Sequence, residues 1–206
     1  PGGTKRRAID VFLNDGEEFV YASPAQGYAQ LSLAYGCLDQ NKRATIFVAQ
    51  RKVLSPLTSQ AEKLGAKIVQ IPMGFLSHVT ARAKEYCKET GAILLPFGLR
   101  DERFIDRLAE IIKDVPIQPK QVWVVASSGT LALALHKAWP DAELCCVRVG
   151  HMPDLENIKL YTAPEKYERP AKFKPPFPSC EHYDAKAWQF IKQYAKPEAL
   201  FWNVGA

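Results

Sequence analysis

Short apolar runs alternate with longer amphipathic stretches along most of this chain, and this alternation most narrows the folds open to it. The apolar runs are rich in β-branched and aromatic residues and nearly continuous in hydrophobicity, as expected of strands buried on both faces. These runs are 19–22, 44–49, 66–71, 92–96, 122–126, 143–149 and 199–204. The helical stretches are 26–38, 54–64, 77–90, 102–113, 131–138 and 185–194. Strands that alternate with helices form βαβ units, so we predict an α/β fold with an open, mostly parallel sheet and helices on both faces.

Single residues mark where several of these helices begin and end. Gly65 and Gly91 follow helical stretches, at the position where glycine often ends a helix. Asp101 precedes the stretch 102–113, and its carboxylate can cap that helix. The stretch 131–138 is almost wholly apolar, so we expect it to be packed inside the molecule.

The length of 206 residues suits one compact domain covering 1–206, with a smaller portion at about 23–98. The segment 163–178 interrupts the pattern because it is rich in proline. Proline fixes φ and lacks a hydrogen-bond donor, so neither a helix nor a central strand is expected there. The segment is either a connection that wraps the surface or a lid that faces the substrate.

The charge and hydropathy of the chain limit the classes of partner that we expect. A net charge of +5 suits anionic cofactors and substrates and does not exclude nucleic acid. The cations form no dense stripe interleaved with aromatic residues, so charge alone does not predict a nucleic-acid binder. No apolar run approaches the roughly 20 residues that span a bilayer. The basic, polar start also has no apolar stretch behind it of the kind that a signal peptide needs. We therefore expect a cytoplasmic protein without a membrane partner.

The cysteines and histidines do not show the spacing of metal ligands. The cysteines form no CxxC pair, and we interpret them as buried free thiols of a reducing compartment. The histidines are scattered, and none is spaced from another histidine or a cysteine as metal ligands are. We predict no metal site. The residues concerned are Cys37, Cys87, Cys145, Cys146, Cys180, His78, His136, His151 and His182.

Two turns between a strand and a helix carry hydroxyl groups. Ser127, Ser128, Gly129 and Thr130 lie between the strand 122–126 and an apolar helix, where hydroxyls and backbone N–H groups can hold a phosphate. The turn 23–27 (SPAQG) follows the first strand, at the end where open α/β sheets bind ligands. The alternative for both turns is that they only cap the helices behind them.

A lysine near the start and an acid near the end complete the polar pattern. Lys5 lies in GGTKRR at 2–7, and a deprotonated amine there could hold a carbonyl compound covalently. Arg6 and Arg7 would lower the pKa of Lys5 by like-charge repulsion if their heads lie close, whereas the alternative is a solvated basic terminus. Asp184 opens the last helix, so it is either an N-cap or a ligand-binding carboxylate.

The order of these segments resembles the fold-type II enzymes that depend on pyridoxal 5'-phosphate (PLP), the tryptophan synthase β-like superfamily. Within that superfamily the chain is similar to the 1-aminocyclopropane-1-carboxylate deaminase and D-cysteine desulfhydrase family. The family carries Gly-Gly-Asn-Lys-x-Arg where this chain has GGTKRR, and a Ser-Asn-His turn where it has SPAQ at 23–26. The family's phosphate turn matches SSGT at 127–130, and its Pro-Val-Tyr-(Glu or Thr)-Gly-Lys matches HYDAK at 182–186.

Two further segments extend the resemblance, and some positions depart from it. LPFG at 95–98 lies where the family has Pro-x-Gly-Gly, and LFWNVG at 200–205 lies where it has an apolar strand ending in His-Thr-Gly-Gly. The family's members are much longer, which implies a reduced small domain here. The Asn-His of the Ser-Asn-His turn is replaced, and Val204 stands where a hydroxyl is usual.

The resemblance implies a set of site residues. Lys5 would hold PLP as a Schiff base and shuttle a proton, while Asp184 would keep the ring nitrogen protonated. Ser23 and Tyr183 would face the substrate, with Tyr183 able to stack on the ring or relay a proton. The residues implied for cofactor binding are Lys5, Gln26, Ser127, Ser128, Gly129, Thr130 and Asp184.

The resemblance leaves three functions open. The first is a PLP-dependent lyase or deaminase that acts on an amino-group substrate. The second is a PLP enzyme that remodels an aminoacylated thymidine nucleotide, free or in DNA, during bacteriophage DNA hypermodification in a host cytoplasm. The third is a non-catalytic protein that binds PLP or a nucleotide on a degenerate form of the fold. Fold analogy also implies a homodimer.

Overall fold

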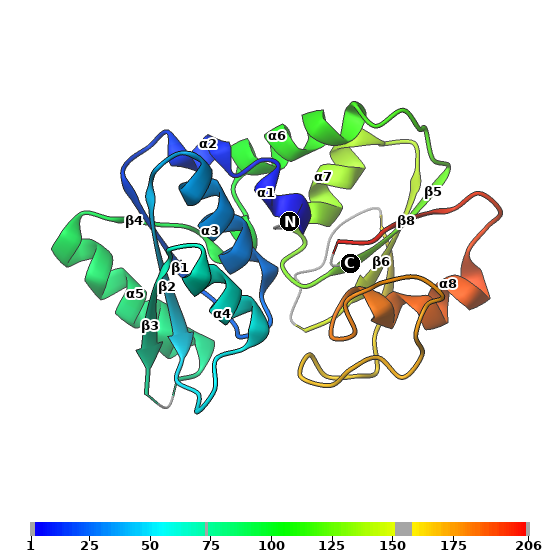
Figure 1. Cartoon of the computed structure of the whole chain (residues 1–206). Coiled ribbons are helices and arrows are strands. Elements are labelled where there is room, and N and C mark those ends of the chain that lie inside the picture. Colours follow the sequence, from blue (N-terminus) through cyan, green and yellow to red (C-terminus); the bar gives the residue numbers. More distant parts are fainter. Residues whose placement is uncertain (1–2, 73, 151–157, 205–206) are drawn as a thin grey trace. The chain divides into compact units, whose positions relative to one another are not determined.

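A computed structural model describes residues 3–72, 74–150 and 158–204, so Gly2, His151 and Gly205 lie outside the described residues. The chain groups into two compact units, Pro1–Leu99 and Arg100–Ala206. Each unit has a sheet of four strands, all paired in parallel (Figure 1). The predicted α/β class is confirmed, but the strands form two sheets where one was expected. The predicted small-domain portion, 23–98, falls within the first unit.

The first unit is built on a sheet with the strand order β3-β2-β1-β4. Its strands are β1 (Glu18–Ala22), β2 (Arg43–Ala49), β3 (Lys67–Ile71) and β4 (Ile93–Leu94). The central strand β1 is buried along all but its first residue, since helices cover both faces of the sheet. The register runs from Glu18 opposite Arg43 to Ala22 opposite Phe47, so the carboxyl ends of these strands share one edge.

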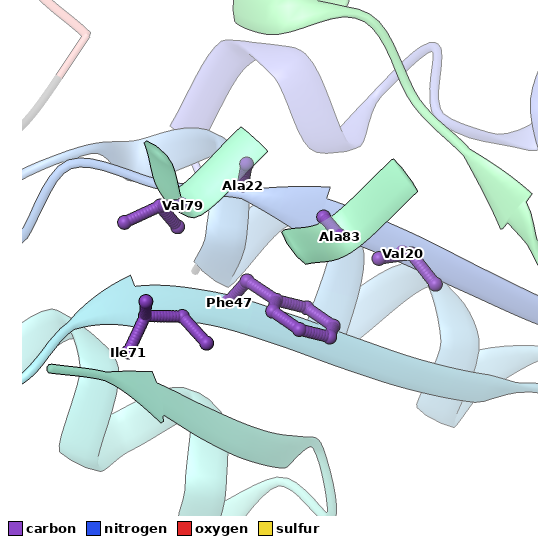
Figure 2. Packing of buried hydrophobic residues seen from close by; sticks show 6 residues of the cluster. All are labelled: Val20, Ala22, Phe47, Ile71, Val79 and Ala83. Atoms are coloured by element: carbon purple, nitrogen blue, oxygen red, sulfur yellow. The ribbon is translucent and has the colours of Figure 1, made fainter. Parts of the chain in front are cut away.

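Helices on the two faces of this sheet bury alternate side chains of the strands. The helices are α1 (Gly3–Arg6), α2 (Asp10–Leu13), α3 (Tyr28–Asp39), α4 (Pro56–Lys63) and α5 (Leu76–Thr90), followed by the 3-10 turn η1 (Phe97–Leu99). Figure 2 shows Val79 and Ala83 of α5 packed over one face, on Phe47 and its neighbours. Along β1, Phe19 and Tyr21 alternate with Val20 and Ala22 of this cluster. Phe19 and Tyr21 are also buried, on the opposite face, which α3 contacts.

The second unit repeats this plan around a sheet with the order β7-β6-β5-β8. Its strands are β5 (Gln121–Ala126), β6 (Glu143–Arg148), β7 (Lys159–Thr162) and β8 (Leu200–Trp202). Its helices are α6 (Glu102–Lys113), α7 (Thr130–Ala138), the 3-10 helix η2 (Asp184–Ala187) and α8 (Trp188–Tyr194). Trp123 and Cys145 pack against Ala187 on one face, while α7 contacts β5 and β6 and packs against α6.

Several local predictions are confirmed. The carboxylate of Asp101 accepts the N–H of Arg103 at 3.0 Å and caps α6. Gly91 ends α5 with a φ of 75°, a conformation that residues with a Cβ rarely adopt. The apolar stretch 131–138 forms the buried helix α7. Cys37, Cys145 and Cys146 are buried free thiols, whereas Cys87 and Cys180 are only partly buried.

Other boundaries differ from the predictions for physical reasons. The predicted strand 92–96 pairs only over Ile93–Leu94, because Pro96 lacks a donor and the chain then enters η1. The predicted helix 26–38 begins two residues later, at Tyr28, which leaves Gln26 in the turn before it. The short helices α1 and α2 and the edge strand β7 were not predicted. Each is only four residues long, too short for its hydrophobic period to be recognised.

None of the described helices combines the length and the apolar character that crossing a bilayer requires. The described residues also place no three His, Cys, Asp or Glu side chains together as a metal ion would need.

Candidate functional site

The turn 127–130 joins β5 to α7 at the carboxyl end of the central strand of its sheet. Gly129 occupies the N-cap of α7 with a φ of 79°, in the left-handed region that favours glycine. The Ser128 and Thr130 hydroxyls lie 3.1 Å apart and share a hydrogen bond. Helix geometry directs the first N–H groups of α7 toward the same turn. Hydroxyls, amide donors and the positive end of a helix therefore converge where an anion such as phosphate could bind.

Tyr183 forms a hydrogen bond with the end of β5, beside this turn. Its hydroxyl donates to the carbonyl oxygen of Val125 at 3.1 Å, two residues before Ser127. Burial raises the pKa of the Tyr183 phenol above its ordinary value of 10.0, and hydrogen bonds with Ser127 only partly oppose that rise. The phenol therefore stays protonated at neutral pH. Its proton is engaged with the Val125 carbonyl, so the observed geometry favours positioning of the turn over proton transfer.

Asp184 follows directly and is completely buried at the start of η2. The carbonyl of Cys180 accepts the N–H groups of both Tyr183 and Ala185, each at 3.0 Å, and this fixes the turn that presents Asp184. The carboxylate of Asp184 contributes to raising the pKa of Tyr183 and of Cys180, so it lies close to both. The N-cap position of η2 is Tyr183, one residue before Asp184, and the Tyr183 side chain makes no capping bond there.

Asn203, at the carboxyl edge of the sheet in the second unit, was not predicted as a site residue. It follows β8, whose Trp202 pairs with Val124 of β5, so it emerges beside the strand that carries the turn 127–130. Its Nδ2 donates to the carbonyl of Pro178 at 2.7 Å, and its Oδ1 accepts the Ser179 hydroxyl at 3.1 Å. Asn203 thus ties the end of the proline-rich connection to the sheet. The available signal was its position just after a strand, where ligands and polar contacts gather.

The proline-rich connection 163–178 has neither helix nor strand, as predicted. Lys186 of η2 fastens its first part, since this completely buried amine donates to the carbonyl of Lys166 at 2.9 Å. Burial lowers the pKa of Lys186 from its ordinary value of 10.5, and Glu165 beside it opposes that shift. The connection is therefore held to the element that carries Asp184.

Replacing Lys186 by methionine should test this role through stability. The change removes the hydrogen bond from the charged amine to the Lys166 carbonyl, which then accepts only the N–H of Arg169. We therefore expect a loss of about 1–3 kcal/mol at pH 7 in urea unfolding. Because the folded pKa is lowered, the unfolded chain binds more protons between that pKa and 10.5, and wild-type stability should rise with pH in this interval. The methionine variant should lack that contribution.

The matched control for this prediction is Lys192→Met, at an exposed lysine of α8. It should leave both the stability at pH 7 and its pH dependence close to those of the wild type. Equal effects of the two substitutions would show that Lys186 does not hold the connection.

In the first unit, Lys5 lies on the short helix α1, which packs against α3. Lys5 is half-buried, and Thr4 before it is buried. The guanidinium of Arg6 pairs with Asp39 of α3 at 2.6 Å and lies 4.7 Å from the centre of the Tyr35 ring. The predicted influence of Arg6 on the pKa of Lys5 required their heads to be close, whereas the structure directs Arg6 to α3. The segment is thus packed against α3 at Thr4, while Arg7 is exposed.

The turn 23–27 connects β1 to α3 at the carboxyl edge of its sheet. Ser23 is buried, and its hydroxyl donates to the carbonyl of Pro24 at 2.9 Å. A Cβ at Gly27 would lie 2.9 Å from the Ser23 hydroxyl oxygen, so only glycine fits without a shift. Gln26 is half-buried within the turn. Glycine at position 27 thus lets the turn approach the Ser23 hydroxyl.

A buried polar network behind this turn was also not predicted. Gln30 of α3 is completely buried, and its Nε2 donates to the carbonyl of Ala25 at 3.2 Å. Its Oε1 accepts the Thr58 hydroxyl at 2.9 Å, and the Ser55 hydroxyl donates to the same Ala25 carbonyl at 2.5 Å. The network orders the turn 23–27 from two helices. A glutamine within an apolar helix was the signal that could have revealed it.

The structure therefore brings the turn 127–130, Tyr183 and Asp184 together within the second unit. Lys5, Ser23 and Gln26 belong to the first unit.

Comparison with known proteins finds a similar phage enzyme. No protein-family model matches the chain. The glycyl-dTMP PLP-dependent decarboxylase of Pseudomonas phage M6 is 25% identical over 213 residues, covering 84% of this chain and 77% of that protein.

Solved structures of two PLP-enzyme types match the chain. An ACC deaminase homologue matches with a TM-score of 0.80 at 14% identity, over 98% of this chain and 79% of that one. The processed form of threonine deaminase isoform 2 from Solanum lycopersicum matches with a TM-score of 0.57 at 14% identity, over 71% of this chain. The chain covers only 43% of that threonine deaminase. The chain has the fold of the fold-type II PLP-dependent enzymes, and the resemblance read from the motifs is confirmed.

Proposed function

We propose that this protein is a PLP-dependent enzyme that removes the carboxyl group from an amino acid carried by a nucleotide. The observation that carries the proposal is the turn 127–130, where two hydroxyls and a glycine-capped helix start converge beside the buried Asp184. That arrangement fits the phosphate and the ring nitrogen of PLP, on a fold that PLP-dependent enzymes share.

PLP, when bound, supplies an aldehyde that links to amines and a ring that withdraws electrons from the attached carbon. We assign its phosphate to Ser127, Ser128, Thr130 and the backbone at Gly129, because their donors belong to one turn at a helix start. We assign the aldehyde to Lys5, whose amine also returns a proton to the carbon that has lost CO2. In this proposal the turn 127–130 binds the phosphate of PLP, and Lys5 binds the aldehyde and transfers the proton.

The remaining predicted residues take supporting roles in this proposal. Asp184, buried and held by the turn at Cys180, is the carboxylate that would keep the ring nitrogen protonated. Gln26 would donate to the ring oxygen, and Ser23 would contact the substrate. Tyr183 would hold the end of β5 in place. Its hydroxyl proton is engaged with the Val125 carbonyl, so we assign it no proton transfer.

The substrate class rests on the phage relative. Its name specifies glycyl-dTMP and decarboxylation, and it aligns with 84% of this chain. Loss of CO2 is a carbanion reaction of the kind that a protonated PLP ring favours. The net charge of +5 suits a substrate that carries phosphate.

Removing the hydroxyls of Ser128 and Thr130 should weaken PLP binding, because both are assigned to the phosphate of PLP. We expect Ser128→Ala with Thr130→Val to raise the dissociation constant of PLP by about 100-fold or more, since two bonds to a charged group are lost and each costs about 1.5–3 kcal/mol. The binding of pyridoxal, which lacks the phosphate, should change little. Absorbance titration measures both constants, and Ser77→Ala at an exposed serine is the control. Equal losses for PLP and pyridoxal would contradict the assignment of the phosphate.

A further inference from the structure

Two strongly exposed apolar side chains lie at the carboxyl edge of the sheet in the first unit. Among the described large hydrophobic residues, Phe75 and Val53 are the most exposed, at 87% and 80%. Arg51, Lys52 and His78 near them are exposed as well. We call these five residues the strand-end surface. Exposed apolar side chains that gather beside cations are typical of binding surfaces.

The strand register brings the two halves of this surface together. β2 and β3 pair in parallel with Ala49 opposite Ile71, so the two strands end side by side at the same edge of the sheet (Figure 1). The N–H of Gln50 donates to the carbonyl of Ile71 at 2.8 Å, and that of Arg51 to Oε1 of Gln70 at 3.2 Å. These bonds join the start of the loop after β2 to the end of β3.

The charge of the strand-end surface is positive. The loops 50–55 and 72–76 contain Arg51 and Lys52 and no acidic residue. Within the described part of the chain, neither cation takes part in an ion pair. The helix α5 begins directly behind its N-cap Phe75 and adds the positive end of a 15-residue helix. An anionic partner with a flat apolar group complements this combination.

The spacing from the turn 23–27 fits a nucleotide. In the order β3-β2-β1, the end of β3 is two strands from the end of β1, or about 10 Å at the usual strand spacing. The Ser55 hydroxyl, which bonds the Ala25 carbonyl, fixes the loop after β2 to that turn. A substrate that places its amino acid at Ser23 and extends along this edge would lay a nucleoside monophosphate on the strand-end surface.

We propose that the strand-end surface binds the nucleotide part of the substrate, with the base against Phe75 and Val53 and the phosphate facing Arg51 and Lys52. This inference rests on the proposed function and adds to it the residues that select a nucleotide. The alternative is that a second copy of the chain covers these apolar side chains. The test below distinguishes nucleotide binding from dimer formation.

The probe is dTMP, with thymidine as the ligand that lacks the phosphate. Phe75→Ser should weaken dTMP and thymidine binding alike, by about tenfold or more, since stacking on an aromatic ring contributes about 1–3 kcal/mol. Arg51→Glu with Lys52→Glu should weaken dTMP binding and remove its salt dependence, while thymidine binding stays unchanged. Titration calorimetry measures these constants without turnover.

Controls use exposed residues elsewhere, Phe173→Ser and Lys84→Glu with Lys88→Glu, which should bind dTMP as the wild type does. Unchanged dTMP affinity in the surface variants would overturn the inference. So would loss of a dimer in Phe75→Ser, seen by sedimentation, without loss of dTMP binding. PLP absorbance is recorded for every variant. A wild type that binds dTMP through this surface but not PLP would reject the proposed function and keep this inference.

Discussion

Lys5→Ala should bind PLP without a covalent link and lose turnover by about a thousandfold or more. The expectation follows from the role that we assign to the Lys5 amine, which both attaches the cofactor and moves a proton, so its loss removes two functions at once. The visible absorbance of the wild type with PLP should be missing or shifted in the variant. Absorbance spectra and single-turnover release of CO2 from an aminoacyl nucleotide measure the two effects.

The comparison for Lys5→Ala is Lys63→Ala, at an exposed lysine of α4. That variant should keep the wild-type spectrum and rate. Circular dichroism should show the same helix content in all three proteins, because Lys5 is only half-buried at the end of a short helix. A Lys5→Ala protein with the spectrum and turnover of the wild type would show that another amine holds PLP.

Asp184→Asn should retain PLP and lose about a hundredfold in turnover. The amide has nearly the volume of the carboxylate, so the buried packing of η2 is kept. An amide cannot hold a proton on the ring nitrogen as a carboxylate does, and the electron-withdrawing power of the ring then falls. The dissociation constant of PLP by titration and the rate of CO2 release separate binding from chemistry.

Asp141→Asn, at an exposed aspartate, is the matched control and should leave both quantities unchanged. Asp184→Asn with undiminished turnover would remove this residue from the site. Loss of PLP binding and turnover together, with a lowered urea midpoint, would point to a purely structural role.

The layered fold could be read from the sequence because strands buried on both faces leave short, continuous apolar runs. Those runs predicted every strand except β7, whose four residues form a partly exposed edge. The division into two sheets could not be read in this way. Hydrophobic periodicity identifies a strand but not its neighbour, and pairing depends on contacts between distant segments.

In the candidate site, the turn 127–130 was predictable because the residues that form it are adjacent in the sequence. Hydroxyls and a glycine between a strand and an apolar helix predicted the turn 127–130, and the structure places Gly129 in the left-handed conformation that this turn needs. Lys186 and Asn203 were missed as supports, because their partners are backbone carbonyls elsewhere in the chain. Burial of a polar side chain depends on tertiary packing, which a single sequence does not display.

Mass spectrometry of the protein after incubation with PLP and reduction by borohydride tests the central claim most directly. Reduction makes a covalent link between the cofactor and its lysine permanent, and peptide mapping locates it. We predict one pyridoxyl group per chain, on the peptide that contains Lys5. A pyridoxyl group on another lysine, or none under conditions that label a known PLP enzyme, would contradict the account.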